Sequence, residues 1–373
     1  MARGYVNMRI GYEAKRVFHN RSGLGNFSRN LVRALATSYP DDEYYLYNPK
    51  KPKVPFGEDL PPVKELRPSI SNPLFVNIWR QRLLADRAKK DQVDIFHGLS
   101  QELPTGLRKR GIPSVLTVHD LIFMRNPQLY KPIDRKIYTR KLKLACQQAT
   151  SIVAISEQTR RDLEEFLKIP AENIKVIYQG CDPLFREEQS ATEIERIKQV
   201  YGLPEKYVLF VGTLEKRKNV AQVVKATQKL EIPLVMIGRA TKYWKKHVEP
   251  GLNHKLVYTP SVMDNQHLAA LYQGATLFVY PSTFEGFGIP VLEALVSKTP
   301  VITSNTSSLP EVAGPSSLLV DPKSQEDLTT AIDRVWRSEE LQKQMMESGY
   351  TFAQHFKDDV IARQWHNLYT SLV

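Results

Sequence analysis

The chain has 373 residues, of which 42% are apolar and 25% are charged, a composition typical of a folded globular protein. This length exceeds one ordinary hydrophobic core and predicts two domains. No apolar run reaches the roughly 18 residues of a membrane-spanning helix, and residues 1–7 lack the apolar core of a secretory signal. The chain holds only two cysteines, which favours a reducing, cytoplasmic location over a disulfide-stapled class.

The positive charge is concentrated in the first half of the chain. Residues 1–200 contain 34 Lys and Arg against 23 Asp and Glu, whereas residues 201–373 contain 18 against 17. An excess of this kind suggests an anionic partner, such as a phospholipid surface or a lipid diphosphate, or serves solubility alone. A nucleic acid is disfavoured, because the sequence shows no recognised nucleic-acid motif and the basic residues are dispersed.

Short β-rich runs alternate with amphipathic segments in the first half, the pattern of parallel α/β units. Strands are predicted at residues 8–12, 94–96, 114–118, 151–155 and 174–178, and helices at 26–37 and 156–167. The strands are apolar on both faces, as a sheet covered by helices on each side requires. The segment 49–73 is rich in Pro and Lys, which predicts an extended loop rather than a strand.

The second half repeats the α/β pattern. Strands are predicted at residues 207–211, 234–237, 256–258, 276–280 and 300–303, and helices at 220–229, 265–273, 290–296 and 325–337. A charged segment between residues 182 and 205 separates the halves. We therefore expect an α/β protein with one domain over 1–190 and a second over 191–355.

The strongest local pattern follows the predicted strand 276–280. A loop carries Glu285, Gly286 and Gly288, and a helix that contains Glu293 begins around Pro290. Ligands bind beyond the carboxyl ends of parallel strands, and glycines let the backbone approach them closely. The two carboxylates could each accept hydrogen bonds from vicinal hydroxyls, one pair on a sugar and one on a ribose. Alternatively, they are an ordinary turn residue and a solvated helix residue.

Two further segments follow predicted strands. Gly212 and Thr213 precede a basic run that contains Arg217 and Lys218. Three consecutive cations at a helix N-terminus could neutralise a diphosphate in place of a divalent metal, although a charge run is also common in solvated loops. His119 ends the strand 114–118 and lies where a ligand would bind, or is simply structural.

A glycine loop with Gly23 and Gly25 follows the first strand. A glycine loop before a helix is a phosphate-binding layout, and a simple tight turn explains it equally well.

These residues together resemble glycosyltransferase family 4, a family of retaining enzymes with the GT-B fold. The spacing of Glu285 and Glu293, with Gly-Phe-Gly-Ile-Pro-Val-Leu before the second, matches the family's motif. Further matches are Leu309-Pro-Glu-Val-Ala-Gly, Asp94-Ile-Phe-His-Gly and Ile155-Ser-Glu. The resemblance implies two facing Rossmann-like domains with a cleft between them. The first domain would take the acceptor, the second would bind the nucleotide sugar, and a last helix around 356–373 would pack back on the first.

The resemblance also implies residue roles. Glu285 would hold hydroxyls of the donor sugar, Lys218 helped by Arg217 would stabilise the departing diphosphate, and His119 would line the reaction centre. The implied donor-binding set is Gly23, Gly25, Gly212, Thr213, Gly286, Phe287, Gly288, Ile289, Leu292 and Glu293. No metal and no cofactor beyond the nucleotide-sugar co-substrate is implied. Many members carry Arg where this chain has Thr213, which leaves the division of roles between Arg217 and Lys218 open.

The Gly-Thr-Leu-Glu segment from Gly212 is most similar to mannosyltransferases of surface-polysaccharide assembly, including lipopolysaccharide. The resemblance therefore implies GDP-mannose as donor and a saccharide or lipid-linked saccharide as acceptor, with UDP-linked sugars as alternatives. A hydrolysing nucleotide-sugar epimerase and a non-catalytic sugar-nucleotide-binding protein of the same fold also stay open. Intact Glu285, Glu293 and Lys218 argue against the non-catalytic form.

Two basic segments in the first half mix cations with large apolar residues, namely 73–90 and 131–143. Either could form an interfacial helix on an anionic membrane, which predicts peripheral contact with the inner face of the cytoplasmic membrane. An ordinary domain helix with one buried face is the alternative.

Overall fold

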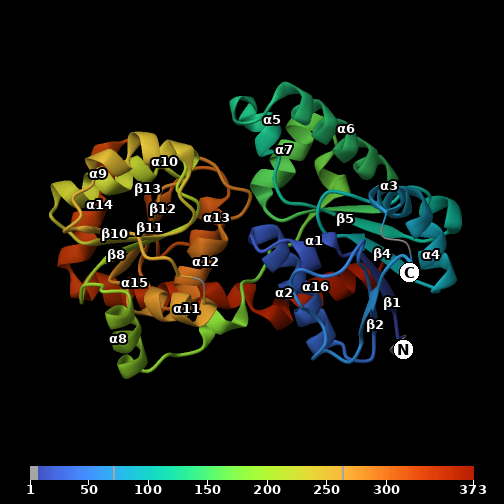
Figure 1. Ribbon diagram of the computed structural model, residues 1–373, viewed down its shortest axis with the longest axis horizontal. Coiled ribbons are helices and arrows are strands. Elements are labelled where there is room, and N and C mark those ends of the chain that lie inside the picture. The colour runs from blue at the N-terminus through green and yellow to red at the C-terminus, as the bar shows by residue number, and fades with distance from the viewer. Residues whose placement is uncertain (1–6, 70–71, 263) are drawn as a thin grey trace. The chain divides into compact units, whose positions relative to one another are not determined.

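The computed structural model describes residues 7–69, 72–262 and 264–373 (Figure 1). The chain divides into two compact units. Unit 1 contains the residues up to Gly180 together with Phe356–Val373, and unit 2 contains Cys181–His355. This division lies before the boundary expected at residue 190.

The segment that follows Gly180 belongs to unit 2 because its side chains pack there. The ring of Phe185 meets Tyr272 edge to face, with centroids 5.6 Å apart. The hydroxyl of Ser297 donates to the carbonyl of Phe185 at 3.1 Å. The charged segment 182–205, at which the two halves were expected to separate, therefore begins with residues that are anchored in unit 2.

Unit 1 is built on a seven-stranded sheet in the order β3-β2-β1-β4-β5-β6-β7, with every pairing parallel. The strands are β1 Arg9–Glu13, β2 Glu43–Tyr47, β3 Val63–Leu66, β4 Ile95–Gly98, β5 Ser114–Val118, β6 Ser151–Ala154 and β7 Ile174–Val176. The α-helices of unit 1 are α1 Lys15–His19, α2 Gly23–Ser38, α3 Pro73–Ile78, α4 Leu84–Lys90, α5 Ile122–Arg125, α6 Pro132–Gln148, α7 Glu157–Leu167 and α16 Asp358–Thr370. A π-helix, η1 Trp79–Leu83, joins α3 to α4, and short 3-10 turns are η2 Arg108–Arg110, η3 Pro127–Leu129 and η4 Ala171–Asn173.

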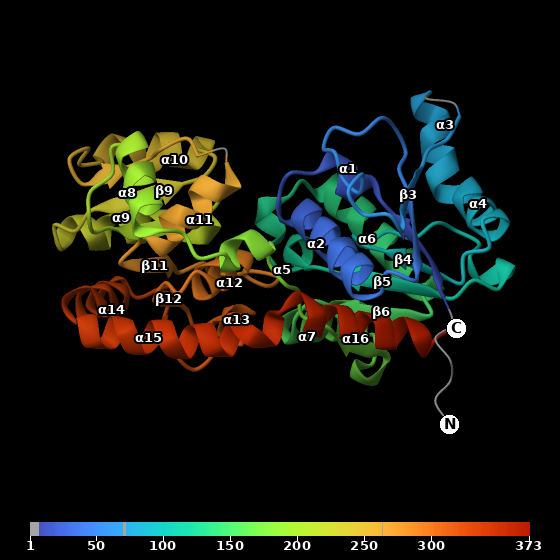
Figure 2. The same cartoon turned by 90° about the horizontal axis from the view of Figure 1, so that it is seen from below.

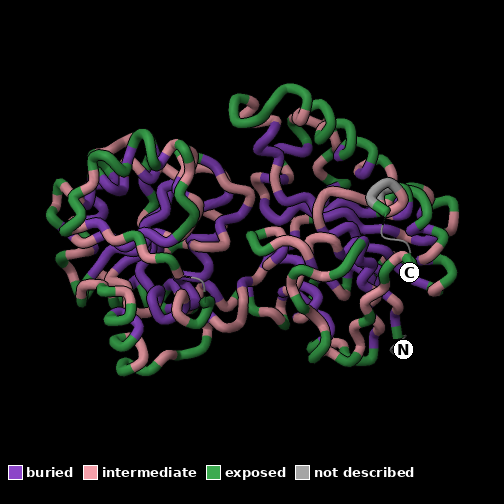
Figure 3. The backbone as a smooth tube through the Cα atoms, viewed as in Figure 1, coloured by how far each residue is buried: buried purple, intermediate pink, exposed green. Residues whose placement is uncertain are grey.

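The two faces of this sheet bury different helices, because side chains alternate along each strand. On one face, Phe96 packs with α4 and Leu116 packs with α6. On the other face, His97 stacks on Trp365 of α16 at 4.7 Å between ring centroids. Figure 2 shows α16 beside α2, in the layer that covers this second face. The strands themselves are the buried centre of the unit (Figure 3).

Unit 2 repeats the architecture with a six-stranded sheet in the order β10-β9-β8-β11-β12-β13, again with every pairing parallel. The strands are β8 Val208–Val211, β9 Leu234–Ile237, β10 Val257–Tyr258, β11 Leu277–Tyr280, β12 Val301–Ser304 and β13 Leu318–Val320. The α-helices are α8 Ala191–Val200, α9 Val220–Lys229, α10 Lys242–His247, α11 Asn265–Gln273, α12 Ile289–Val296, α13 Leu309–Ala313, α14 Gln325–Arg337 and α15 Glu339–Phe352. The 3-10 turns are η5 Pro183–Arg186, η6 Lys216–Lys218, η7 Glu249–Gly251 and η8 Ala353–Phe356, which ends in unit 1.

Two sequence predictions were wrong. The segment 49–73 is not all loop, because Val63–Leu66 forms the edge strand β3, paired to β2 through residues such as Tyr44 and Val63. Gly23 and Gly25 do not lie in a loop before the helix, because α2 already begins at Gly23, with Ser22 as its N-cap. Residue 25 in this first turn must be glycine, because an added Cβ would clash with the carbonyl oxygen of Asn20 at 1.9 Å.

Both sheets have a topological switch point, where chain order reverses between neighbouring strands. In unit 1 the reversal lies between β1 and β4, and in unit 2 between β8 and β11. Ligands of open α/β sheets bind beyond the carboxyl ends of the strands at such points. Within the described residues, each helix is too short or too polar to cross a membrane.

Candidate active site

The site in unit 2 forms where β8 and β11 end side by side. Gly212, which follows β8, has a φ of +146°, a backbone conformation that residues other than glycine rarely adopt. An added Cβ there would lie 3.4 Å from the ammonium nitrogen of Lys218. The loop after β11 brings Glu285 to the same point, so residues far apart in sequence meet at one switch point.

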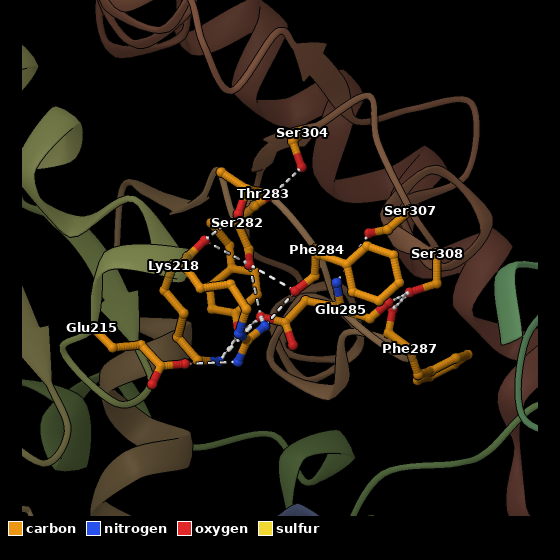
Figure 4. A network of polar contacts seen from close by, with 12 residues as sticks. Glu215, Lys218, Ser282, Thr283, Phe284, Glu285, Phe287, Ser304, Ser307 and Ser308 are labelled. Atoms are coloured by element: carbon orange, nitrogen blue, oxygen red, sulfur yellow. Dashed lines mark hydrogen bonds and ion pairs between the residues drawn. The ribbon is translucent and has the colours of Figure 1, made fainter. Parts of the chain in front are cut away.

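Glu285 is the centre of the polar network in Figure 4. Its Oε1 accepts hydrogen bonds from the hydroxyls of Ser282 at 2.8 Å and Tyr280 at 2.9 Å. The cations of Arg217 and Lys218 lie 2.9 and 3.2 Å from the same oxygen. Burial alone would raise the pKa of Glu285, but Lys218 and Arg217 lower it to about 2. Glu285 is therefore a fixed carboxylate at physiological pH.

Arg217 ties the basic turn η6 to the loop after β11. Its guanidinium donates to the carbonyl oxygen of Phe284 and to Glu215, whose Oε1 lies 2.7 Å away, in addition to its contact with Glu285. Its own carbonyl accepts from the backbone N–H of Thr283 at 2.8 Å. A side chain held by three acceptors and only 14% exposed is engaged in positioning the loop.

Lys218 has fewer protein partners. Its ammonium donates to the hydroxyl of Tyr280 and to Glu285, and it lies 4.8 Å from the centre of the Tyr280 ring. An ammonium has three donors and no acceptor. Two of these donors bond to Tyr280 and Glu285. The third can donate to an anion beside Gly212.

The conformation of the loop between Glu285 and α12 depends on Gly288 and on hydrogen bonds from Ser308. Gly288 is the N-cap of α12 with a φ of +113°, and an added Cβ would lie 2.8 Å from Leu309. The hydroxyl of Ser308 donates to the carbonyls of Glu285 and Phe287, at 2.9 Å each. Gly286 lies in this loop, whereas Phe287 is buried and Ile289 begins the helix.

Glu293 lies one turn into α12 and is 8% exposed. Its Oε2 accepts a hydrogen bond from the hydroxyl of Tyr272 at 3.0 Å. Burial raises its pKa to about 7, although the Tyr272 hydrogen bond opposes that rise. Leu292 beside it is fully buried. The pKa values of the two motif carboxylates are therefore shifted in opposite directions, down for Glu285 and up for Glu293.

His119 lies in unit 1 at the carboxyl end of β5 and is 5% exposed. Its Nε2 is 2.8 Å from the carbonyl oxygen of Leu99, so Nε2 carries the proton and Nδ1 the lone pair. The ring of Phe27 packs against it edge to face at 4.6 Å. Burial lowers the pKa of His119 to about 4, which leaves a neutral imidazole.

Sequence reasoning missed several residues of these sites. Tyr272 positions the carboxylate of Glu293, and Ser308 positions the backbone of Glu285. A signal for Ser308 existed, because serines follow both β11 and β12. In unit 1 it missed a partly buried ion network of Glu13, Arg80 and Glu102 at the β1/β4 switch point. The described residues contain no group of three or more His, Cys, Asp and Glu side chains that could hold a metal ion.

Two models of known protein families together match most of the chain. The model described as Glycosyltransferase Family 4 matches residues 21–184, and that described as Glycosyl transferases group 1 matches residues 193–352. The O-antigen chain mannosyltransferase B of Escherichia coli is 28% identical over 98% of this chain and 100% of its own length. The serotype-specific mannosyltransferase WbdA of Escherichia coli is also 28% identical over 71% of this chain, which spans 34% of that longer protein.

Solved structures share the fold. A sucrose-phosphate synthase from Thermosynechococcus elongatus superposes with a TM-score of 0.79 at 21% identity, over 98% of this chain and 99% of the other. The Anabaena protein HepE in complex with UDP-glucose has a TM-score of 0.75 at 18% identity, over 98% and 100% of the two chains. With the two parallel sheets and the matched family models, these findings show that the chain belongs to glycosyltransferase family 4 and is a glycosyltransferase of the GT-B fold.

Proposed function

We propose that the protein transfers mannose from GDP-mannose to a saccharide or lipid-linked saccharide acceptor in cell-surface polysaccharide synthesis, with retention at the anomeric carbon. The observation that carries the proposal is the pairing of Lys218 with Glu285 at the β8/β11 switch point. It provides a cation for a diphosphate and a fixed carboxylate for sugar hydroxyls. The mannosyltransferases among the relatives support the choice of sugar.

In this proposal, Lys218 and Arg217 have different roles, because their contacts differ. Lys218 donates to the diphosphate as negative charge develops on the leaving group, which is the point where electrostatic stabilisation lowers the barrier most. Arg217 is a positioning residue, because its guanidinium already serves the loop after β11. Thr213 and the backbone of Gly212 border the same anion position.

The remaining motif residues would bind the donor. Glu285 accepts from hydroxyls of the mannose, and Glu293 accepts from the two ribose hydroxyls. The backbone from Gly286 to Leu292 approaches the sugar and the diphosphate. His119, with its unprotonated Nδ1, acts as a hydrogen-bond acceptor for substrate and not as an acid. A phosphate oxygen of the leaving group would take the acceptor's proton, as retaining members of the family are expected to do.

The donor class is tested by thermal shift with GDP, UDP, ADP and their common sugar conjugates. We expect the midpoint to rise with GDP and GDP-mannose and not with the other nucleotides, because a ligand that binds only the folded state stabilises it. A rise with the UDP series alone would replace mannose as the donor sugar. Absence of any shift would contradict a donor site at Lys218 and Glu285.

We also propose peripheral contact with an anionic membrane, and helix α6 supports it. Leu142 packs into the core, while Ile133, Ile137 and Leu144 are 61%, 45% and 46% exposed. At about 100° per residue these three fall within about 40° of one another on the opposite side of the helix. In Figure 3, α6 consists mostly of exposed and intermediate residues. The flanking cations are Lys136, Arg140, Lys141 and Lys143. Such a stripe suits insertion among anionic lipid headgroups.

Segment 73–90 adds less to this surface than its sequence suggested. Trp79 and Leu84 are buried, whereas Ile78 and Leu83 are 51% and 39% exposed. The side chain of Leu74 lies outside the described residues. Eight of the twelve exposed large apolar side chains among the described residues lie in this segment or between Leu129 and Leu144. A concentration of this kind marks an interaction surface rather than scattered exposure.

The double variant Ile133→Ser/Ile137→Ser is expected to bind anionic phosphatidylglycerol vesicles at least about tenfold more weakly than the wild type, because it removes two of the inserted side chains. Co-sedimentation with these vesicles and with neutral phosphatidylcholine vesicles measures the effect. The matched control is Val200→Ser, which removes an equally exposed apolar side chain from unit 2. Equal pelleting of the wild type with both lipids would contradict the membrane contact.

A further inference from the structure

An ion network at the β1/β4 switch point of unit 1 is not used by the proposed donor site. Arg80 lies 2.9 Å from Oε1 of Glu13, the last residue of β1, and 2.6 Å from Oε2 of Glu102. Lys141 of α6 lies 3.6 Å from Oε1 of Glu102. Arg80 belongs to the π-helix η1, a type of turn frequently found at functional sites. The network holds Glu102 in one place while its side chain stays 37% exposed.

A cavity of about 170 Å³ opens beside Glu102. It lies between η1, the segment that follows β4 and the second half of α6. Its polar lining is Gln81, Glu102, Thr105, Lys141 and Gln148, and Leu103 and α6 supply an apolar wall. The lining therefore offers amide, carboxylate, hydroxyl and ammonium groups around a small apolar surface.

The Glu102 end of this cavity lies close to the carboxyl edge of the sheet, whereas Gln148 at its other end lies beside Ser114, the first residue of β5, whose hydroxyl donates to the carbonyl of Gln148 at 3.5 Å. His119, at that edge, is bonded to the carbonyl of Leu99, and Gln101 donates from its side chain to the carbonyl of Asp120 at 2.7 Å. The four residues from Leu99 to Glu102 place their two end Cα atoms at most about 10 Å apart, even when the chain is extended. The Glu102 end of the cavity is thus about one or two sugar rings away from the edge at which ligands of such sheets bind.

The size and chemistry of the cavity favour a neutral sugar. Its volume equals that of about six water molecules at about 30 Å³ each, which suits one pyranose ring. Pyranoses present hydroxyls that need both donors and acceptors, together with C–H groups that pack on apolar surface. The carboxylate of Glu102 is balanced by Arg80 and Lys141, so the lining does not favour an ion of either sign.

Resting on the proposed function, we propose that this cavity binds one pyranose unit of the acceptor saccharide, next to the unit that receives the new sugar. Glu102 accepts from a hydroxyl of that unit, and the amides of Gln81 and Gln148 donate to or accept from its neighbours. The site adds affinity for a longer acceptor and none for a single sugar.

The test measures binding of α-linked mannotriose and of methyl α-mannoside to the full chain by calorimetry, without donor. For the double variant Gln81→Ala/Gln148→Ala we expect the mannotriose dissociation constant to rise about tenfold, equivalent to about 1.4 kcal/mol. The value for methyl α-mannoside should stay unchanged. Gln147→Ala is the matched control, because Gln147 neighbours Gln148 on α6 and lines other cavities; it should bind as the wild type does.

Equal mannotriose affinity of the wild type and the double variant would overturn the inference, as would a wild type that binds neither saccharide. A parallel loss for methyl α-mannoside would also overturn it, because it would show a general defect. Failure of the proposed function is read separately, from turnover of GDP-mannose with methyl α-mannoside. That turnover is expected to persist in the double variant, since neither amide belongs to the donor site.

Discussion

Lys218→Ala should fold and lose about three orders of magnitude in kcat. Removing one preorganised donor from a charge that develops in the transition state costs about a hundredfold to a thousandfold, and here the donor is a full cation beside a departing diphosphate. The fold should survive, because Glu285 keeps its contacts with Arg217, Tyr280 and Ser282. Steady-state rates at saturating donor, with circular dichroism as the folding check, measure the effect.

Lys216→Ala is the control for this prediction. Lys216 belongs to the same basic turn but is exposed, so its removal lowers the local charge by the same amount without touching Glu285. We expect its rate within about threefold of the wild type, as for screened surface charges. A fully active Lys218→Ala enzyme, or equal losses in both variants, would refute the assignment of the diphosphate to Lys218.

Glu293→Gln is expected to stabilise the unliganded protein at pH 8 while it weakens nucleotide binding. The folded-state pKa of Glu293 is raised to about 7 from the usual 4.5. The folded protein therefore keeps a proton that the unfolded chain has lost, and stability falls as pH rises from 4.5 through 7. The full difference is about 3 kcal/mol above pH 7. A glutamine avoids this loss and still accepts from Tyr272.

Urea unfolding at pH 5 and pH 8 measures the effect of Glu293→Gln, and the gain should appear mainly at pH 8. Glu285→Gln is the control with the opposite sign. The pKa of Glu285 is lowered to about 2, so its stabilisation is present above pH 4.5 and is lost as pH falls through 2. Its replacement should destabilise the protein at both pH values. A pH-independent effect of Glu293→Gln would contradict the raised pKa.

The affinity for GDP should follow the same titration. An ionised carboxylate accepts from two ribose hydroxyls better than a protonated one, so the wild type should bind GDP more tightly at pH 8 than at pH 6. Calorimetry at the two pH values should show this difference for the wild type and not for Glu293→Gln.

The strands that sequence predicted were those with apolar residues on both faces. Residues 114–118 and 234–237 coincide with β5 and β9. The missed strands have weaker patterns, because β13 is only three residues long and β3 is a four-residue edge strand in which the adjacent Lys64 and Glu65 interrupt any apolar alternation. β2 did carry a signal, since Tyr44, Leu46 and Tyr47 are all buried aromatic or aliphatic residues.

Only one part of the site could be predicted from the sequence, namely that residues which follow parallel strands lie at the carboxyl edge of the sheet. Lys218 and Glu285 each follow a strand, and the meeting of β8 and β11 brings them together. The opposite pKa shifts of the two glutamates could not be predicted, because they depend on burial and on partners such as Tyr272. The network of Glu13, Arg80 and Glu102 depends on η1 packing across the sheet, which no local pattern encodes.

Proton NMR of the purified chain with GDP-mannose and an α-mannoside acceptor is the most direct measurement. We expect a new α-anomeric mannosyl signal on the acceptor, with GDP released in equal amount and the signal absent with Lys218→Ala. A β-anomeric product would contradict retention. GDP-mannose that stays intact, or that yields only free mannose, would contradict mannosyl transfer to a saccharide.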